Sequence, residues 1–228
     1  MAQRWSTLLF MHWEVPVQVL EAIVPRPLAL DLFERRAWVS IAPFYLSHLH
    51  ARGLPPIPGT SAFAELNVRT YVTIGGKPGV YFFSLDASNA LAVAGARMFY
   101  HLPYYRAAMS VRRSTSGQIA YSSRRTHSGA PPATFEGRYR PVGAPSTSAP
   151  GTLDHWLAER YCLYAVDFRR HIYRAEIHHR PWPLQPAEVE IAVNRMAEAR
   201  GIEVAARPDR QSYAEQLDVV VWRPERVT

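Results

Sequence analysis

The period-two alternation of apolar and polar residues over the first 150 positions constrains the fold of this chain more than any other feature. Such alternation is typical of β-strands, because successive side chains of a strand point to opposite faces of a sheet. It predicts strands at 8–15, 28–33, 37–44, 63–74, 80–85, 108–113, 118–124 and 134–140. We expect the second and third of these to pair across Glu34–Arg36, and the next two to pair across the turn Gly75–Gly79.

Helical signals are fewer. They predict helices at 17–24, at 90–100 after a Ser88 or Asn89 cap, at 152–160, and from Pro186 to a stop at Gly201. Strands at 161–169 and 172–179 should form a hairpin, and another strand is expected at 216–222. The loop at 53–59 holds three prolines, which excludes a central strand there. No repeat or long linker divides the chain, so we expect one α+β, mainly β domain over 1–228, built on an antiparallel barrel or sandwich.

The charge is basic, with a net value of +7, and all but one of the 26 basic residues are arginine. Thirteen arginines against five acidic residues lie in 97–180. Arginine pairs there alternate with apolar residues on expected strands, which places neighbouring charges on opposite faces. This pattern favours a solvated, ion-paired surface, with an anion-binding or nucleic-acid-binding surface as the alternative.

The sequence lacks the motifs of several common binding sites and catalytic sites. Cys162 is the only cysteine, which excludes an internal disulfide and a cysteine-based zinc site. The neighbours His178 and His179 should point opposite ways, and neither this pair nor His48 and His50 has a carboxylate or third histidine at the spacing of a helical metal site. A metal site assembled from distant residues is the open alternative. The turn Gly75–Gly79 lacks the P-loop pattern, and no G-x-S-x-G elbow occurs. No apolar run is long enough for a membrane helix and no signal peptide is recognised, so a cytoplasmic protein is expected.

Two segments carry candidate site residues. Strand alternation places Glu65, Asn67, Arg69 and Tyr71 on one face of the strand at 63–74. That face is either the solvent side of a sheet or a polar row inside a barrel, where a buried Glu beside an Arg would handle protons and anions. The second segment, from Tyr100 to Arg106, holds three tyrosines, a histidine and an arginine, which could form a pocket wall or an ordinary aromatic helix end.

A family resemblance adds to this interpretation. The runs 63–72 and 76–86, the segment from His178 to Gln185, and the ending around Leu217–Trp222 resemble the YqjF-like family of the acetoacetate decarboxylase-like superfamily. The resemblance implies a single cone-like β-barrel with a central pocket and a few flanking helices, and it makes Glu65 similar to the family's pocket carboxylate. On that fold, the face of Glu65 is expected to line the pocket.

The chain departs from the decarboxylases at one decisive place. Their Phe-Pro-Lys-Lys segment, whose first lysine forms a Schiff base with a keto acid, corresponds here to Leu102-Pro103-Tyr104-Tyr105. A phenol cannot form an imine. Lys77, the only lysine, lies in an expected turn, so Schiff-base decarboxylation is not expected.

The leading hypothesis is a pocket that binds a small carboxylated or carbonyl-bearing molecule, without cofactor or metal. If the protein is an enzyme, we expect a lysine-independent lyase or isomerase. Glu65 would be the general base with a pKa raised by burial, and Tyr104 or His101 would stabilise an oxyanion. Arg69 or Arg106 would hold the anion, with pocket contacts expected from Asn67, Tyr71, Tyr100 and Tyr105. The alternative is a binding or sensing barrel without catalysis; no membrane partner is expected, and a homo-oligomer is left open.

Overall fold

The computed structural model describes residues 1–51, 53, 55, 59 and 61–227. In these residues the chain forms three α-helices, a short 3-10 turn (Glu198–Arg200) and a sheet of thirteen strands. The helices are α1 Val17–Glu21, α2 Ala90–Tyr100 and α3 Leu153–Ala158. The strands are β1 Ala2–Val15, β2 Ala29–Leu30, β3 Ala37–His50, β4 Phe63–Ile74, β5 Lys77–Ala87, β6 Tyr104–Arg113, β7 Ile119–Arg125, β8 Thr134–Pro141, β9 Cys162–Val166, β10 Ile172–His179, β11 Gln185–Asn194, β12 Arg210–Val221 and β13 Glu225–Arg226.

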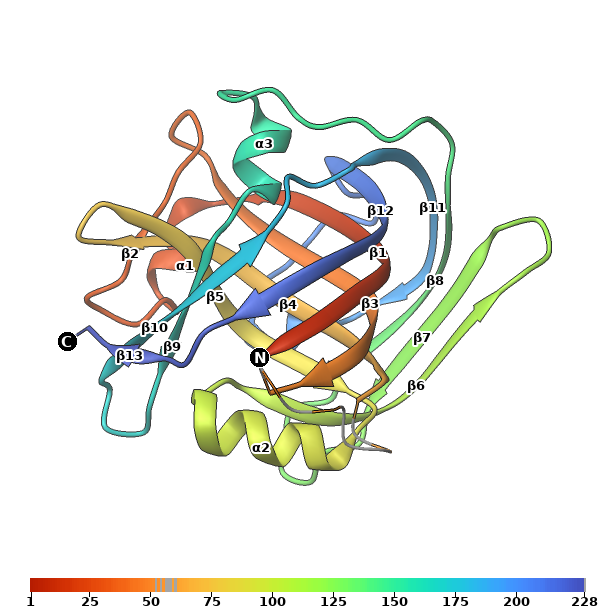
Figure 1. The fold of residues 1–228 in the computed structure, drawn as a ribbon. Coiled ribbons are helices and arrows are strands. Elements are labelled where there is room, and N and C mark those ends of the chain that lie inside the picture. The colour runs from red at the N-terminus through yellow and green to blue at the C-terminus, as the bar shows by residue number, and fades with distance from the viewer. Residues whose placement is uncertain (52, 54, 56–58, 60, 228) are drawn as a thin grey trace.

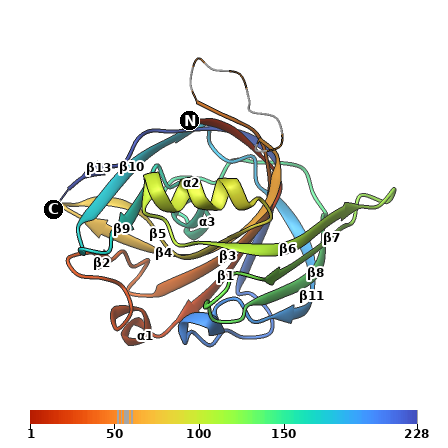
Figure 2. The ribbon, with the colours of Figure 1, turned by 90° about the horizontal axis from the view of Figure 1, so that it is seen from below.

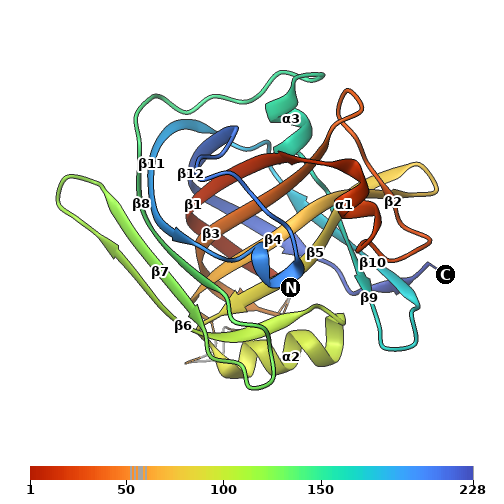
Figure 3. The same ribbon diagram turned by 180° about the vertical axis from the view of Figure 1, so that it is seen from behind.

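The strand pairings close on themselves. The succession β12-β1-β3-β4-β5-β9-β10 returns to β12 through the β10–β12 pairing, which makes a ring of seven strands. A second ring shares β12, β1, β3, β4 and β5 and is completed by β6, β7, β8 and β11 (Figure 1). Pairings are antiparallel except where β5 meets β6 and β9. The hairpin of β6 and β7 projects beyond the rest of the sheet (Figure 3).

Because the two rings share a wall, runs of consecutive residues in β1, β3 and β4 are buried on both faces. On β1, Leu8 and Phe10 belong to one hydrophobic core, whereas Leu9 and Met11 belong to a second core on the opposite face. β4 shows the same division, and all of its residues from Phe63 to Val72 are buried. The sheet therefore separates two cores.

Helix α2 lies across the end of the seven-stranded ring (Figure 2). Its bounds are those the sequence predicts. The Asn89 side chain caps it by accepting hydrogen bonds from the backbone N–H groups of Leu91 and Ala92, both at 3.0 Å. It ends at Tyr100, and His101, which follows as the C-cap, has a left-handed φ of 54°. No helix among the described residues is long and apolar enough to cross a membrane.

The strand predictions are confirmed for β4 to β10, with small changes at the ends. β1, β3 and β12 are longer than predicted. The predicted pairing of 28–33 with 37–44 is wrong: β2 pairs with β4, although Glu34 and Arg35 do form a turn with positive φ. Of the predicted loop 53–59, residues 54 and 56–58 lie outside the described residues.

The predicted helix from Pro186 to Arg200 is also wrong. The segment forms β11, paired with β8, and then the 3-10 turn that ends at Gly201. Ala187, Val189 and Ile191 alternate with Glu188 and Glu190, and β-branched side chains favour strands. The proline and the acidic residues near its start resemble a helix N-terminus, but pairing with β8 decides the outcome.

Candidate functional site

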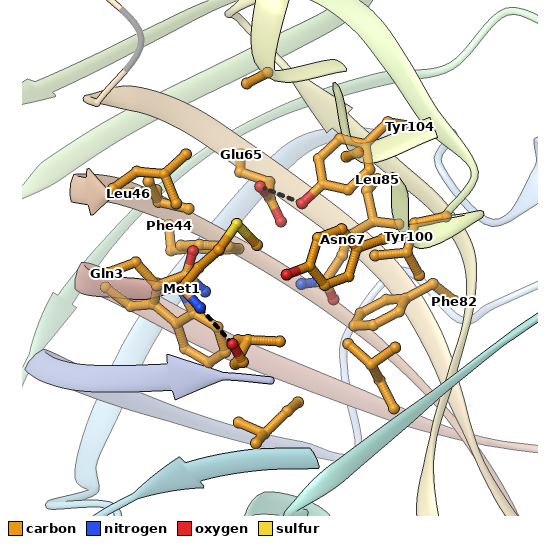
Figure 4. Close-up of a pocket in the computed structure, with 18 of the residues that line it drawn as sticks. Met1, Gln3, Phe44, Leu46, Glu65, Asn67, Phe82, Leu85, Tyr100 and Tyr104 are labelled. Atoms are coloured by element: carbon orange, nitrogen blue, oxygen red, sulfur yellow. Dashed lines mark hydrogen bonds between the residues drawn. The ribbon is translucent and has the colours of Figure 1, made fainter. Parts of the chain in front are cut away.

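A cavity of about 360 Å³ opens inside the seven-stranded ring, beneath α2 (Figure 4). Aromatic and aliphatic side chains make most of its wall, including Trp5, Phe44, Phe82, Leu85 and Trp182. α2 contributes Leu91, Ala92, Gly95, Ala96, Phe99 and Tyr100 along the rim. The volume and the largely apolar wall are typical of a small-molecule pocket.

The polar floor of this cavity comes from β4. Glu65, Asn67 and Arg69 alternate along the strand, line the cavity and are each less than 10% exposed. Leu66, Val68 and Val72 point into the opposite core. Burial on both faces excludes the interpretation of this polar row as a solvent face.

The buried Glu65 forms a pair with the partly buried Tyr104. The Tyr104 hydroxyl donates a 2.9 Å hydrogen bond to Glu65 Oε2 (Figure 4). Burial raises the pKa of the Glu65 carboxyl to about 8, although the bond from Tyr104 favours the ionised form and opposes this rise. Burial also raises the pKa of Tyr104 well above its ordinary value, and the neighbouring Glu65 adds to that effect. At pH 7 the Glu65 carboxyl is therefore mostly protonated, and it ionises as the pH rises through about 8, whereas Tyr104 remains a donor.

Arg69 is a buried cation without an acidic partner. It forms no ion pair among the described residues, and its guanidinium carbon lies 5.1 Å from the centroid of the Phe10 ring. Its Nε and the Oδ1 of Asn67, two positions away on β4, have no hydrogen-bond partner among the described residues. Burial lowers the pKa of Arg69. Guanidinium nevertheless stays charged in proteins, so the cavity carries a positive charge that the protein does not neutralise.

Arg160 is a second cavity arginine, which sequence analysis missed. It follows α3, donates from Nε to the Trp156 carbonyl at 2.7 Å, and pairs through Nη1 with Asp31. Its guanidinium carbon lies 4.2 Å from the Trp156 ring centroid and 4.9 Å from that of Tyr71. Its Nη2 is buried without a partner. No local pattern marks Arg160, because the partners that bury it come from distant segments.

His179 and Trp182 complete the wall opposite β4. The predicted opposition of the two neighbouring histidines is confirmed, since His179 is buried and His178 is exposed. His179 Nδ1 lies 2.8 Å from the Arg180 carbonyl, so it carries the proton in this hydrogen bond. Burial lowers the pKa of His179 and keeps the ring neutral near pH 7. His179 lies in a segment that carries the family resemblance, but the sequence analysis does not predict it as a site residue.

The other predicted site residues divide between the cavity and its surroundings. Tyr100 lines the cavity. Tyr71 is fully buried behind the floor, where its hydroxyl lies 3.2 Å from His12 Nδ1. Tyr105 points to the opposite face from Tyr104 and stacks beneath Arg125 at 4.2 Å.

His101 and Arg106 also lie away from the cavity. The His101 ring packs 4.6 Å from Tyr173 outside the wall, and Arg106 is exposed. The structure therefore brings together Glu65, Asn67, Arg69, Tyr100 and Tyr104, and leaves Tyr71, His101, Tyr105 and Arg106 outside.

No lysine side chain lines the cavity. Lys77 begins β5, and its Nζ lies 2.6 Å from Glu176 Oε1. Among the described residues, no three His, Cys, Asp or Glu side chains gather closely enough to hold a metal ion. Arginines of the basic middle segment form ion pairs, as Arg113 does with Glu215 and Arg140 with Glu188.

The arrangement of strands and helices defines an acetoacetate decarboxylase-like fold. The enduracididine biosynthesis enzyme MppR, solved with the condensation product of pyruvate and imidazole 4-carboxaldehyde, matches with a TM-score of 0.68 at 11% identity, over 100% of this chain and 89% of that one. An acetoacetate decarboxylase structure matches with a TM-score of 0.65 at 13% identity, over 99% and 88%. At such low identity, these likenesses show the fold alone.

The chain belongs to the DUF2071 family, described as an uncharacterized conserved protein, whose model matches residues 2–218. It is 49% identical over 222 residues to "Uncharacterized protein YqjF" of Bacillus subtilis (strain 168), a match that covers 97% of this chain and 90% of that protein. The family resemblance predicted from the sequence is confirmed.

Proposed function

We propose that this protein binds a small organic molecule bearing a carboxylate or carbonyl group, and that Glu65 transfers a proton to or from it without a Schiff-base lysine. In this proposal, the seven-stranded ring is the cone-like barrel of the superfamily and the cavity beneath α2 is its ligand pocket. The observation that carries it is the hydrogen bond between Tyr104 and the buried Glu65 in a largely apolar cavity. Glu65 shares its face of β4 with Arg69, which has no acidic partner among the described residues.

The pair is suited to chemistry next to a carbonyl. A general base works best when its pKa lies near the working pH, and burial brings Glu65 there. The Glu65 carboxylate would take a proton from the carbon beside the carbonyl, and the Tyr104 hydroxyl would donate to the enolate oxygen. Return of that proton to another atom gives an isomerase, whereas loss of a leaving group from the neighbouring carbon gives a lyase.

The solved relatives support the ligand class. One structure of MppR contains pyruvate, and another contains a condensation product of pyruvate, so this fold accommodates keto acids. This chain has tyrosine at both positions of the decarboxylase lysine pair. Because a phenol cannot form an imine, the proposed chemistry does not use one. The same substitution favours the alternative candidate, a barrel that binds its ligand without changing it.

A ligand screen in deuterated water separates these candidates. Keto acids, hydroxy acids, phenols and aldehydes are screened for a rise in Tm, and each hit is recovered and analysed by mass spectrometry. We expect a carbonyl-bearing hit to return with deuterium or in altered form. Recovery of every hit intact and without deuterium would leave the binding protein as the function.

The role of Glu65 is tested with two variants. Glu65→Gln keeps the size of the side chain but cannot take up a proton, so exchange should fall by ~100-fold or more. Glu136→Gln is the matched control, because Glu136 is exposed on β8. Exchange by Glu65→Gln at the wild-type rate would show that Glu65 is not the base.

A further inference from the structure

Several buried polar atoms without a hydrogen-bond partner gather around the floor of the cavity. On the apolar wall, Trp5 Nε1 has no hydrogen-bond partner among the described residues. At the floor, three buried atoms lack one: Asn67 Oδ1, Arg69 Nε and Arg160 Nη2. All three residues line the cavity, and each is at least nine-tenths buried. Buried polar groups are almost always hydrogen-bonded, so such a group in a pocket indicates a ligand.

The three residues are also neighbours. Asn67 and Arg69 are two positions apart on β4, which separates their side chains by ~7 Å along one face. Arg160 comes from beyond α3 but is close enough to lower the pKa of Arg69 by charge repulsion, a smaller effect than that of burial. Both guanidinium groups also lie beside Tyr71, whose hydroxyl is 3.2 Å from His12 Nδ1.

The charges around these residues do not balance. Arg160 is neutralised by Asp31, and burial keeps His179 neutral and raises the pKa of Glu65 to about 8. Arg69 is left as a buried cation with no counter-charge among the described residues. An unpaired buried charge is strongly unfavourable, so a bound anion would relieve it.

We propose that Asn67, Arg69 and Arg160 form an anion subsite for a 2-hydroxy carboxylate. The carboxylate accepts hydrogen bonds from Arg69 Nε and Arg160 Nη2, and the hydroxyl of the ligand donates to Asn67 Oδ1. This inference rests on the proposed function and narrows its ligand class. Because Asn67 lies between Arg69 and Glu65 on the strand, the hydroxyl-bearing end of the ligand faces Glu65, and its apolar group packs against Phe44, Phe82 and Trp182.

Three matched probes test the subsite by calorimetry: mandelate, phenylacetate, which lacks the hydroxyl, and mandelamide, which lacks the charge. We expect mandelate to bind on the order of 10-fold more tightly than phenylacetate, since phenylacetate leaves Asn67 Oδ1 unpaired. Mandelamide should bind on the order of 30-fold more weakly than mandelate, or not at all, because it leaves the arginine charge unpaired.

Variants assign these differences to residues. Arg69→Met should weaken binding of both acids on the order of 30-fold or more. Asn67→Leu should abolish the preference for mandelate and leave phenylacetate affinity unchanged. Arg106→Met is the matched control: Arg106 is exposed outside the cavity, so all three affinities should be retained.

Urea denaturation without ligand provides a second, independent readout. If Arg69 had a structural role, its replacement would lower the stability of the protein. Because it is an unpaired buried charge, the urea denaturation midpoint of Arg69→Met should be equal to or above the wild-type value.

A lower midpoint for this variant would overturn the subsite, as would equal affinities for the two acids or unchanged acid binding by Arg69→Met. If neither acid binds while aldehydes or phenols do, the subsite is wrong and the broader proposed function stands. If no compound of the larger screen binds, the proposed function itself is wrong.

Discussion

The buried carboxyl of Glu65 should make the stability of this protein depend on pH in a way that one substitution removes. In the unfolded chain this carboxyl ionises near its ordinary pKa of 4.5, whereas in the folded protein burial raises the pKa to about 8. The folded state therefore binds the proton more tightly. The resulting stability is fully present below pH 4.5 and is lost as the pH rises through 8.

The size of this effect follows from the two pKa values. They differ by about 3.5, and each pH unit between them is worth about 1.4 kcal/mol. Between pH 5 and 9, the contribution of Glu65 to the free energy of unfolding should fall by about 4 kcal/mol. Glu65→Gln has no such titration, although its amide oxygen can still accept the hydrogen bond from Tyr104.

Urea denaturation of both proteins from pH 5 to 9 measures the difference directly. Wild type should lose about 4 kcal/mol relative to Glu65→Gln over this range. His12 and His179 are present in both proteins, so their titration cancels. Glu136→Gln should follow the wild-type curve. Parallel curves for wild type and Glu65→Gln would refute the reasoning, and so would the absence at pH 7 of an infrared band from a protonated carboxyl that Glu65→Gln removes.

Three further substitutions test which interactions stabilise the structure around the cavity. Arg125→Met leaves Asp86 as an unpaired buried charge where the two now lie 2.7 Å apart, so urea denaturation should show a loss of ~3–5 kcal/mol. Gly79→Ala places a methyl group 2.6 Å from Cys162 Sγ and 2.8 Å from the Cys162 carbonyl, and it should lower stability by ~1–3 kcal/mol in the same assay. Asn89→Ala removes the cap of α2, which should cost ~1 kcal/mol and speed hydrogen exchange in that helix; unchanged exchange would contradict the capping role.

Much of the local structure follows from local sequence. β4 and α2 have the bounds that alternation, the Asn89 cap and Pro103 predict. The two exceptions share a cause. At 28–33 and 186–200 the local signals were compatible with more than one structure, and pairing with β4 or β8 selected between them.

From the sequence, residues of the candidate site could be grouped only where they lie on the same strand. Alternation placed Glu65, Asn67 and Arg69 on one face, and it could also show that Tyr104 and Tyr105 point apart. It could not say which of those tyrosines enters the cavity, because that depends on how β6 meets β5. Arg160 could not be predicted as a site residue from the sequence, because its burial depends on α3 and on the segment that holds Asp31.

The sequence by itself determined most of the strands, the capped helix, the polar face of β4 and the absence of a Schiff-base lysine at the family's position, because each depends on neighbouring residues. The tertiary structure decided that this polar face is buried, that Glu65 meets Tyr104, and that Arg69 lies without an acidic partner. These properties depend on the closure of two rings that share five strands, which joins residues as distant as Met11 and Gln211. Long-range pairing of this kind fixes the burial, and burial sets the pKa values and the unpaired charge from which function is inferred.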